Sequence, residues 1–252
     1  MPQVETAHRD GVAVITLSDP DRRNALNVEL CDELTAAVDA AEADTSVGAI
    51  VVTGAGKAFC AGANLAELGA SRREGLERIY LGFLRVASSS LPTVAAVNGA
   101  AVGAGMNLAL ACDVRVVGRR ARFDTRFVDL GIHPGGGHTW MLRRIVGQQT
   151  AAAMVLFGEV LDGEAAARVG LAWRCVDDGA LLDEAVGLAA HAASCPRDLV
   201  AKVKATLATM AGVDSHEAAV AVELEPQLWS MDQPAFAERL AQIQARISGS
   251  SR

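Results

Sequence analysis

Apolar residues follow two different spacings along this chain. Short runs that are apolar at almost every position are typical of buried strands, whereas recurrence at every third or fourth position is typical of helices. The short runs predict strands over 12–17, 49–53, 93–97 and 114–117, and a last short strand over 171–176. The helical spacing predicts helices over 28–43, 72–89, 103–111, 148–157, 162–169, 181–194, 197–210, 215–229 and 234–247.

The order of these elements indicates the fold class. Strands alternate with helices in the first part of the chain, and helices dominate from Gly147 onward. This order is typical of an α/β core followed by a helical C-terminal region. Within the core, the strand at 50–54 leads through a glycine turn into the tiny residues 60–63, and the strand at 94–99 leads in the same way into 102–105. We expect these two segments to lie side by side as successive coils of a repeating unit.

The composition narrows the class of protein. Of the 252 residues, 51% are hydrophobic and 21% are charged, which favours a folded chain over a disordered one. The formal net charge of -7 argues against a generally basic, nucleic-acid-binding surface. The five cysteines are scattered without a CxxC pair, and the N-terminus has no apolar signal core. These features predict a soluble protein of the reducing cytoplasm, without a disulfide framework, a zinc knot or a membrane span.

Several familiar motifs are incomplete. Gly56-Lys57 ends like a phosphate-binding loop, but Ala58 replaces the required Ser or Thr. Gly103-Ala104-Gly105 opens a helix after a strand but lacks the third glycine of a dinucleotide fingerprint. No G-x-S-x-G nucleophile elbow occurs. His133 and His138 flank a glycine run that is unsuited to rigid metal ligation, so no metal site is expected and His138 is interpreted as a surface loop histidine.

Two loops of tiny residues carry the clearest chemical signal. Side chains are almost absent at Ala61-Gly62-Ala63 and at Gly103-Ala104-Gly105, so any function there must come from the main chain. The second loop opens a helix, whose first N–H groups have no intrahelical acceptor and carry the positive end of the helix dipole. One N–H from each loop, aimed at one point, would hold a developing oxyanion. The alternative is that both loops are tight packing turns between strand and helix.

At these residues the chain resembles the crotonase, or enoyl-CoA hydratase/isomerase, family. The loop Ala58-Phe59-Cys60-Ala61-Gly62-Ala63-Asn64-Leu65 is similar to the family's A-F-C-A-G-A-D-L loop. The segment 96–105 resembles its second oxyanion loop, and 130–137 resembles its L-G-x-x-P-G-x-G turn. The segment Arg22-Arg23-Asn24-Ala25-Leu26-Asn27 resembles its R-x-N-A-L motif near the CoA nucleotide. Four motifs in the family's order make this resemblance specific.

The resemblance implies a fold, an assembly and a ligand. The fold would be a spiral of ββα repeats over 1–195, followed by a helical region over 196–252 that assembles trimers or dimers of trimers. The ligand would be an acyl-CoA thioester, with coenzyme A as part of the substrate and no separate cofactor. The thioester carbonyl would lie between the N–H groups of Ala63 and Ala104, with the adenine and phosphates near Arg22, Arg23 and Ala25. Further binding residues would come from the two loops and the glycine-rich turn: Ala61, Asn64, Leu65, Gly103, Pro134 and Gly135.

The chain departs from the family at both positions of the usual acid–base pair. Typical hydratases of the family have glutamates where this chain has Asn107 and Phe127. Both residues are expected to line the substrate site. The Asn107 amide can orient a water molecule but cannot exchange a proton at neutral pH, and the Phe127 ring can do neither. Hydration of an enoyl group needs both proton removal and proton donation.

Other residues near these motifs are candidates for the proton transfer. They are Asp129, His133 and Glu67, each of which can equally be an ordinary surface or turn residue. Cys60 has no visible activating base and is interpreted as a small buried hydrophobic residue.

Two classes of function therefore stay open. The first is an enzyme acting on a CoA thioester through an enolate, nominally an enoyl-CoA hydratase of fatty acid metabolism. An isomerase, decarboxylase or thioester hydrolase with a relocated acid or base belongs to the same class. The second is an acyl-CoA binder or sensor without turnover.

Overall fold

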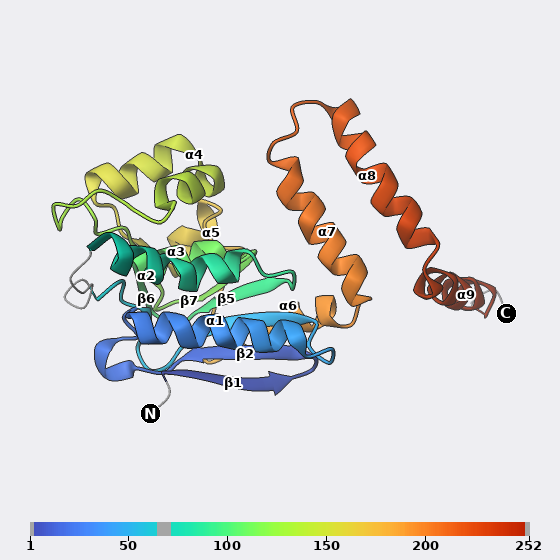
Figure 1. Ribbon diagram of the computed structural model, residues 1–252, viewed down its shortest axis with the longest axis horizontal. Coiled ribbons are helices and arrows are strands. Elements are labelled where there is room, and N and C mark those ends of the chain that lie inside the picture. Colours follow the sequence, from blue (N-terminus) through green and yellow to red (C-terminus); the bar gives the residue numbers. More distant parts are fainter. Residues whose placement is uncertain (1–2, 65–71, 250–252) are drawn as a thin grey trace. The chain divides into compact units, whose positions relative to one another are not determined.

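The computed structural model describes residues 3–64 and 72–249. The chain divides into two compact units, Met1–Ser194 and Cys195–Arg252. The first unit contains both β-sheets (Figure 1). The second unit consists of helices.

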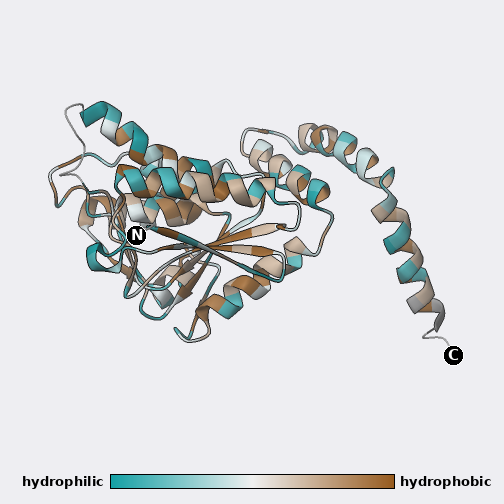
Figure 2. Ribbon diagram, turned by 60° about the horizontal axis from the view of Figure 1, so that its bottom comes forward, coloured by the Kyte–Doolittle hydropathy of each residue, from teal (hydrophilic) through white to brown (hydrophobic). Residues whose placement is uncertain are grey.

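A six-stranded sheet forms the centre of the first unit. Its strands lie in the order β1 (Val4–Arg9), β2 (Val12–Leu17), β3 (Ala49–Gly54), β5 (Thr93–Val97), β7 (Val114–Gly118) and β10 (Arg174–Val176). The β1–β2 pair is antiparallel and the other neighbours are parallel. Helix α6 (Leu181–Ala193) packs on one face, while α1 (Val28–Ala43) and α3 (Ala104–Ala111) contribute to the core on the other. Because both faces are covered, the inner strands are apolar at most positions, as the brown colour of the strands in Figure 2 shows.

A second, smaller sheet completes the repeating unit. It has the order β4 (Ala58–Cys60), β6 (Ala100–Val102), β8 (Arg122–Asp124) and β9 (Leu161–Asp162), in which β4, β6 and β8 are parallel. Along the chain, β3 and β4 precede α2 (Arg72–Ala87), β5 and β6 precede α3, and β7 and β8 precede α4 (His138–Phe157). Because β3 pairs with β5 and β4 pairs with β6, the two tiny-residue segments are neighbouring coils. The predicted α/β fold with a repeating strand–strand–helix unit is confirmed.

Several elements differ from the prediction. The structure also contains β1, β4, β6, β8 and β9, which the sequence did not predict. The small-sheet strands have only two or three residues each, which is too short for a periodic signal. Helix α4 starts at His138, whereas the predicted helix starts at Gln148. Gly147, with φ 76°, divides α4 into two helical segments. The predicted helix was the second of these segments.

The remaining elements are short or lie in the second unit. In the first unit, these elements are the 3-10 helix η1 (Pro20–Arg22) and helix α5 (Gly163–Arg168). The second unit contains α7 (Arg197–Met210), α8 (His216–Met231) and α9 (Pro234–Gly249). Lys202 on α7 lies 4.5 Å from the centre of the Trp229 ring on α8, so the two helices are in contact. In the described part of the chain, no helix is both long enough and apolar enough to cross a membrane.

Candidate active site

Asn24 anchors the first tiny-residue loop. Its side chain is fully buried, and Nδ2 donates to the carbonyl oxygens of Ala55, Ala58 and Phe59 at 3.0, 2.9 and 3.3 Å. The backbone then continues alongside the loop, because Leu26 N donates to Gly62 O at 2.7 Å. The arginine-containing motif at 22–27 and the loop at 58–64 are therefore one structural unit, although the sequence separates them.

The two tiny-residue loops are in direct contact. A Cβ on Gly105 would lie 2.1 Å from the carbonyl oxygen of Cys60, and a Cβ on Gly62 would lie 3.0 Å from the carbonyl oxygen of Val102. No larger residue fits at position 105 without moving the backbone of the first loop. Gly62 and Gly103 also have positive φ values of 105° and 51°, which favour glycine.

Ala63 and Ala104 each present a main-chain N–H at this contact. Gly62 O and Asn64 N are hydrogen bonded to Leu26, so in the alternating pattern of a strand the Ala63 N–H points to the opposite side. Ala104 is the first residue of α3, where the N–H groups have no intrahelical acceptor. Within the ranges that the structure describes, neither N–H donates to a protein acceptor. The two residues follow the paired strands β4 and β6 and therefore lie on neighbouring coils.

Asn107 lies one turn along α3 from Ala104 and is buried. Its Nδ2 donates to Gly135 O at 3.0 Å, and its Oδ1 lies 2.7 Å from Nδ1 of His138. The amide therefore connects α3 to the glycine-rich turn and to the start of α4. Both of its polar atoms have protein partners.

His138 does not lie in a surface loop, so that interpretation was wrong. It is the first residue of α4 and only 1% exposed. Its ring packs edge-on against Phe127, with centroids 4.9 Å apart and planes at 62°. Burial lowers the pKa of His138 to about 4, so the imidazole is neutral at pH 7. The sequence did not indicate that His138 is buried against Asn107. The two residues are 31 positions apart, and the glycines before His138 interrupt any periodic pattern.

Phe127 is the second of the two residues that stand where the resemblance predicts a glutamate. It is half-buried and begins a turn rather than a strand. Its Cζ lies 3.7 Å from the position that a Cβ on Gly103 would occupy. Phe127 thus bridges the second loop and His138.

The two acid–base candidates Asp129 and His133 lie at the surface of the first unit. Asp129 is exposed and lines a small cavity of about 150 Å³ with Val155 and Phe157 near the end of α4. His133 is exposed, and its Nδ1 lies 2.7 Å from Pro134 O. Within the described ranges, neither side chain forms a hydrogen bond with Ala63 or Ala104. Leu65 and Glu67 lie outside the described residues.

Other residues around the site complete its wall. Pro134 and Gly135 are half-buried, and a Cβ on Gly135 would lie 2.2 Å from the hydroxyl of Tyr80 on α2. Tyr80 gave no signal beyond helical spacing in the sequence. Cys60 is fully buried, and burial raises its pKa to about 12. Its thiol stays protonated at neutral pH, as expected of a buried structural cysteine.

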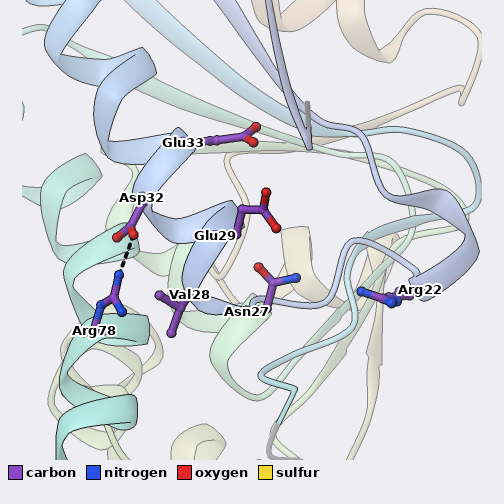
Figure 3. A pocket seen from close by; sticks show the side chains of 7 residues that line it. All are labelled: Arg22, Asn27, Val28, Glu29, Asp32, Glu33 and Arg78. Atoms are coloured by element: carbon purple, nitrogen blue, oxygen red, sulfur yellow. Dashed lines mark hydrogen bonds and ion pairs between the residues drawn. The ribbon is translucent and has the colours of Figure 1, made fainter. Parts of the chain in front are cut away.

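Arg22 lies beside a cavity of about 510 Å³ that α1 and α2 also line (Figure 3). Arg78 in this cavity is paired with Asp32 at 2.6 Å, and Glu29 and Glu33 are also part of its wall. Figure 3 shows the Arg22 side chain apart from that pair. Arg23, the neighbouring cation, is exposed, and Ala25 is half-buried. In the described residues, no group of three acidic, histidine or cysteine side chains forms a metal cluster.

Comparison with known proteins gives the class to which this fold and site belong. The family model for enoyl-CoA hydratase/isomerase matches residues 7–237. The chain is 53% identical over 244 residues to a probable enoyl-CoA hydratase of Mycobacterium tuberculosis, covering 93% of this chain and 94% of the relative. It is 37% identical over 198 residues to the 1,2-epoxyphenylacetyl-CoA isomerase of Escherichia coli, covering 74% of each chain. The crystal structure of a probable enoyl-CoA hydratase/isomerase from Mycobacterium abscessus matches with a TM-score of 0.90 and 29% identity, over 98% of this chain and 97% of that one.

These matches assign the chain to a family of CoA-thioester enzymes. The chain belongs to the enoyl-CoA hydratase/isomerase family, within the crotonase superfamily.

Proposed function

We propose that this protein binds an acyl-CoA thioester and stabilises its enolate between the main-chain N–H groups of Ala63 and Ala104. The observation that supports the proposal is the close contact of Gly105 with Cys60, which joins the loop containing Ala104 to the loop containing Ala63. An enolate oxygen gains negative charge as the α-proton leaves, and two fixed donors stabilise this charge more than they stabilise the neutral carbonyl.

The proposed substrate is an enoyl-CoA ester, and the nominal reaction is hydration in fatty acid metabolism. Relatives named as hydratases and an isomerase support this class of reaction. Coenzyme A enters as part of the substrate, with its adenine and phosphates beside Arg22, Arg23 and Ala25 and no separate cofactor. The acyl part lies along the residues of the loops and the glycine-rich turn: Ala61, Asn64, Leu65, Gly103, Asn107, Phe127, Pro134 and Gly135.

The test combines turnover with the removal of one main-chain donor. Crotonyl-CoA is mixed with the purified protein, and the ultraviolet band of the conjugated thioester is followed. Ala104→Pro removes the N–H at a helix position where proline is tolerated. We expect this variant to lose on the order of 10²–10³ in rate. His216→Pro, at the first position of α8, is the matched control and should keep the rate of the natural protein.

Equal rates in Ala104→Pro and the natural protein would exclude the proposed oxyanion site. No turnover of crotonyl-CoA or of a longer enoyl-CoA would remove the hydratase assignment.

A second candidate function is acyl-CoA binding without turnover. Two observations favour it: both polar atoms of the Asn107 amide have protein partners, and Phe127 carries no acid. Calorimetric binding of crotonyl-CoA and butyryl-CoA, with no chemical change in either thioester, is the result expected of a binder. Chemical conversion of either ester would exclude this candidate.

The proposal includes assembly into trimers or dimers of trimers in the cytoplasm, through the helical region at 196–252. Support comes from apolar side chains that stay exposed on these helices, including Leu207, Leu228 and Phe236. Sedimentation equilibrium should give three or six times the chain mass of 26.2 kDa. A monomer at micromolar concentration would contradict the assembly without bearing on the oxyanion site.

A further inference from the structure

The His138 imidazole is a buried polar group whose second nitrogen has no partner. Its Nδ1 lies 2.7 Å from Asn107 Oδ1. Its Nε2 is buried and has no hydrogen bond to any described residue. Buried polar atoms are usually paired, so an unpaired one at a candidate active site is a feature that needs a functional explanation.

The hydrogen bonds of Asn107 determine which ring nitrogen carries the proton. Gly135 contributes a carbonyl oxygen, which only accepts, so the Asn107 atom 3.0 Å from it is the NH₂ group. The other Asn107 atom is therefore the carbonyl oxygen, which also only accepts. His138 must donate to it through Nδ1–H. In the neutral ring, Nε2 then carries a lone pair and is the basic nitrogen.

The position of this imidazole links it to the proposed oxyanion site. Asn107 is on the same helix as Ala104, three positions further along. Phe127 contacts the imidazole at 4.9 Å between ring centroids, and the same phenyl ring lies against Gly103. His138 thus contacts both residues that replace the expected glutamates, Asn107 and Phe127, beside the loop that contains the Ala104 N–H.

We propose that Nε2 of His138 is the group that removes and returns the α-proton of the acyl-CoA thioester. This inference rests on the function proposed above. The α C–H bond breaks, and its electron pair forms the carbon–carbon double bond of the enolate. The carbonyl π pair moves onto the oxygen held by Ala63 and Ala104. The proton bonds to Nε2, and the resulting imidazolium still donates Nδ1–H to Asn107. Return of the proton to carbon reverses each change.

Access to Nε2 depends on Phe127. The nitrogen is buried, whereas the phenyl ring that packs against its imidazole is half-buried. Because the phenyl ring contacts both the imidazole and Gly103, we expect it to move when an acyl chain enters beside Gly103 and reaches Nε2. Once the ring has moved, the proton on Nε2 exchanges with solvent before a proton returns to carbon.

The direct test is α-proton exchange of butyryl-CoA in D₂O, followed by mass spectrometry. The natural protein should incorporate deuterium. His138→Gln keeps a donor for Asn107 and an acceptor in place of Nε2, but it has no base. We expect it to lose roughly 100-fold or more in exchange rate, while its Kd for butyryl-CoA changes less than about three-fold. His216→Gln, on an exposed residue of α8, is the matched control and should exchange normally.

The outcomes separate this inference from the proposed function. Exchange at the same rate in His138→Gln and the natural protein would overturn the role of His138 and leave the oxyanion site intact. Binding of butyryl-CoA without exchange by the natural protein would also overturn it. Failure of the natural protein to bind any acyl-CoA would overturn the proposed function, and with it this inference.

The tautomer gives a test that needs no substrate. In ¹⁵N-labelled protein, long-range proton–nitrogen spectra distinguish Nδ1–H from Nε2–H rings. The chain has only five histidines, and His138→Gln removes the resonance to be assigned. We expect Nδ1–H with an unprotonated Nε2 at pH 7. A ring protonated at Nε2 at that pH would overturn the proposal even if every variant folds and binds normally.

Discussion

Asn107 on α3 and His138 on α4 are joined by a 2.7 Å hydrogen bond across 31 positions of sequence. Both residues are buried. The bond holds the start of α4 against α3, whose first residue is Ala104. One amide thereby positions an imidazole and supports the glycine-rich turn through Gly135.

Replacing Asn107 by leucine should destabilise the protein. The change leaves the Nδ1–H of His138 buried without its partner and removes one of the two hydrogen bonds that Gly135 O accepts, the other coming from His138 N at 3.3 Å. An orphaned buried polar group costs about 1–3 kcal/mol, so we expect a loss of roughly 1–3 kcal/mol in the free energy of unfolding. Urea unfolding followed by circular dichroism measures it. A loss under about 0.5 kcal/mol would mean that these bonds contribute little to stability.

The stability of the protein should fall as the pH drops below about 6.5. Burial lowers the pKa of folded His138 from 6.5 to about 4, so between these values the unfolded chain binds a proton that the folded chain does not. This difference favours unfolding, and its effect grows as the pH falls from 6.5 to 4. Between pH 7.5 and 5, the natural protein should lose about 2 kcal/mol more than His138→Gln. Urea unfolding at both pH values gives the difference. Parallel curves for the two proteins would contradict it.

Gly105→Ala should damage the contact between the two loops. The new Cβ would meet the Cys60 carbonyl at 2.1 Å, so one loop must move and we expect a loss of about 2–3 kcal/mol. Gly187→Ala on α6 is the matched control, because nothing lies within 4 Å of its added Cβ. That change should stabilise the protein by about 0.5–1 kcal/mol through helix propensity. Thermal unfolding of both variants is the measurement, and equal effects would refute the steric argument.

Glu42 connects α1 to the segment before β5. Its carboxylate accepts hydrogen bonds from Arg85, Ser89 and Ser90. Burial by itself raises the pKa of Glu42, but the hydrogen bonds, that from Arg85 first, outweigh burial and lower it to about 2. This stabilisation is complete above about pH 4.5 and is lost as the pH falls toward 2.

Glu42→Gln should therefore lower the free energy of unfolding by about 1–2 kcal/mol at pH 7, with a smaller loss near pH 2. Guanidinium unfolding at the two pH values measures both. Glu164→Gln, in an exposed pair with Arg119, is the control and should change stability by less than about 0.5 kcal/mol. A loss from Glu42→Gln that is the same at both pH values would contradict the proposed pKa.

The sequence alone was sufficient to predict the strands and helices that are long enough to show an apolar pattern of their own. The mostly apolar runs of β2, β3, β5 and β7 predicted buried strands, as expected where both faces of a sheet are covered. The helical spacing over 28–43 predicted α1, and the side chain of Asn27 caps this helix by accepting from Leu30 N at 2.7 Å. The three-residue strands β4, β6 and β8 could not be predicted in this way, because so few residues show no period.

By itself, the sequence determined the alternation of strands and helices, the two tiny-residue loops and the absence of carboxylates at Asn107 and Phe127. Only the tertiary structure decided which side chains meet. It placed His138 in the interior against Asn107, and it left Asp129 and His133 exposed. The physical reason is that a hydrogen bond or a ring contact depends on distance in space, whereas a linear pattern records only neighbours along the chain.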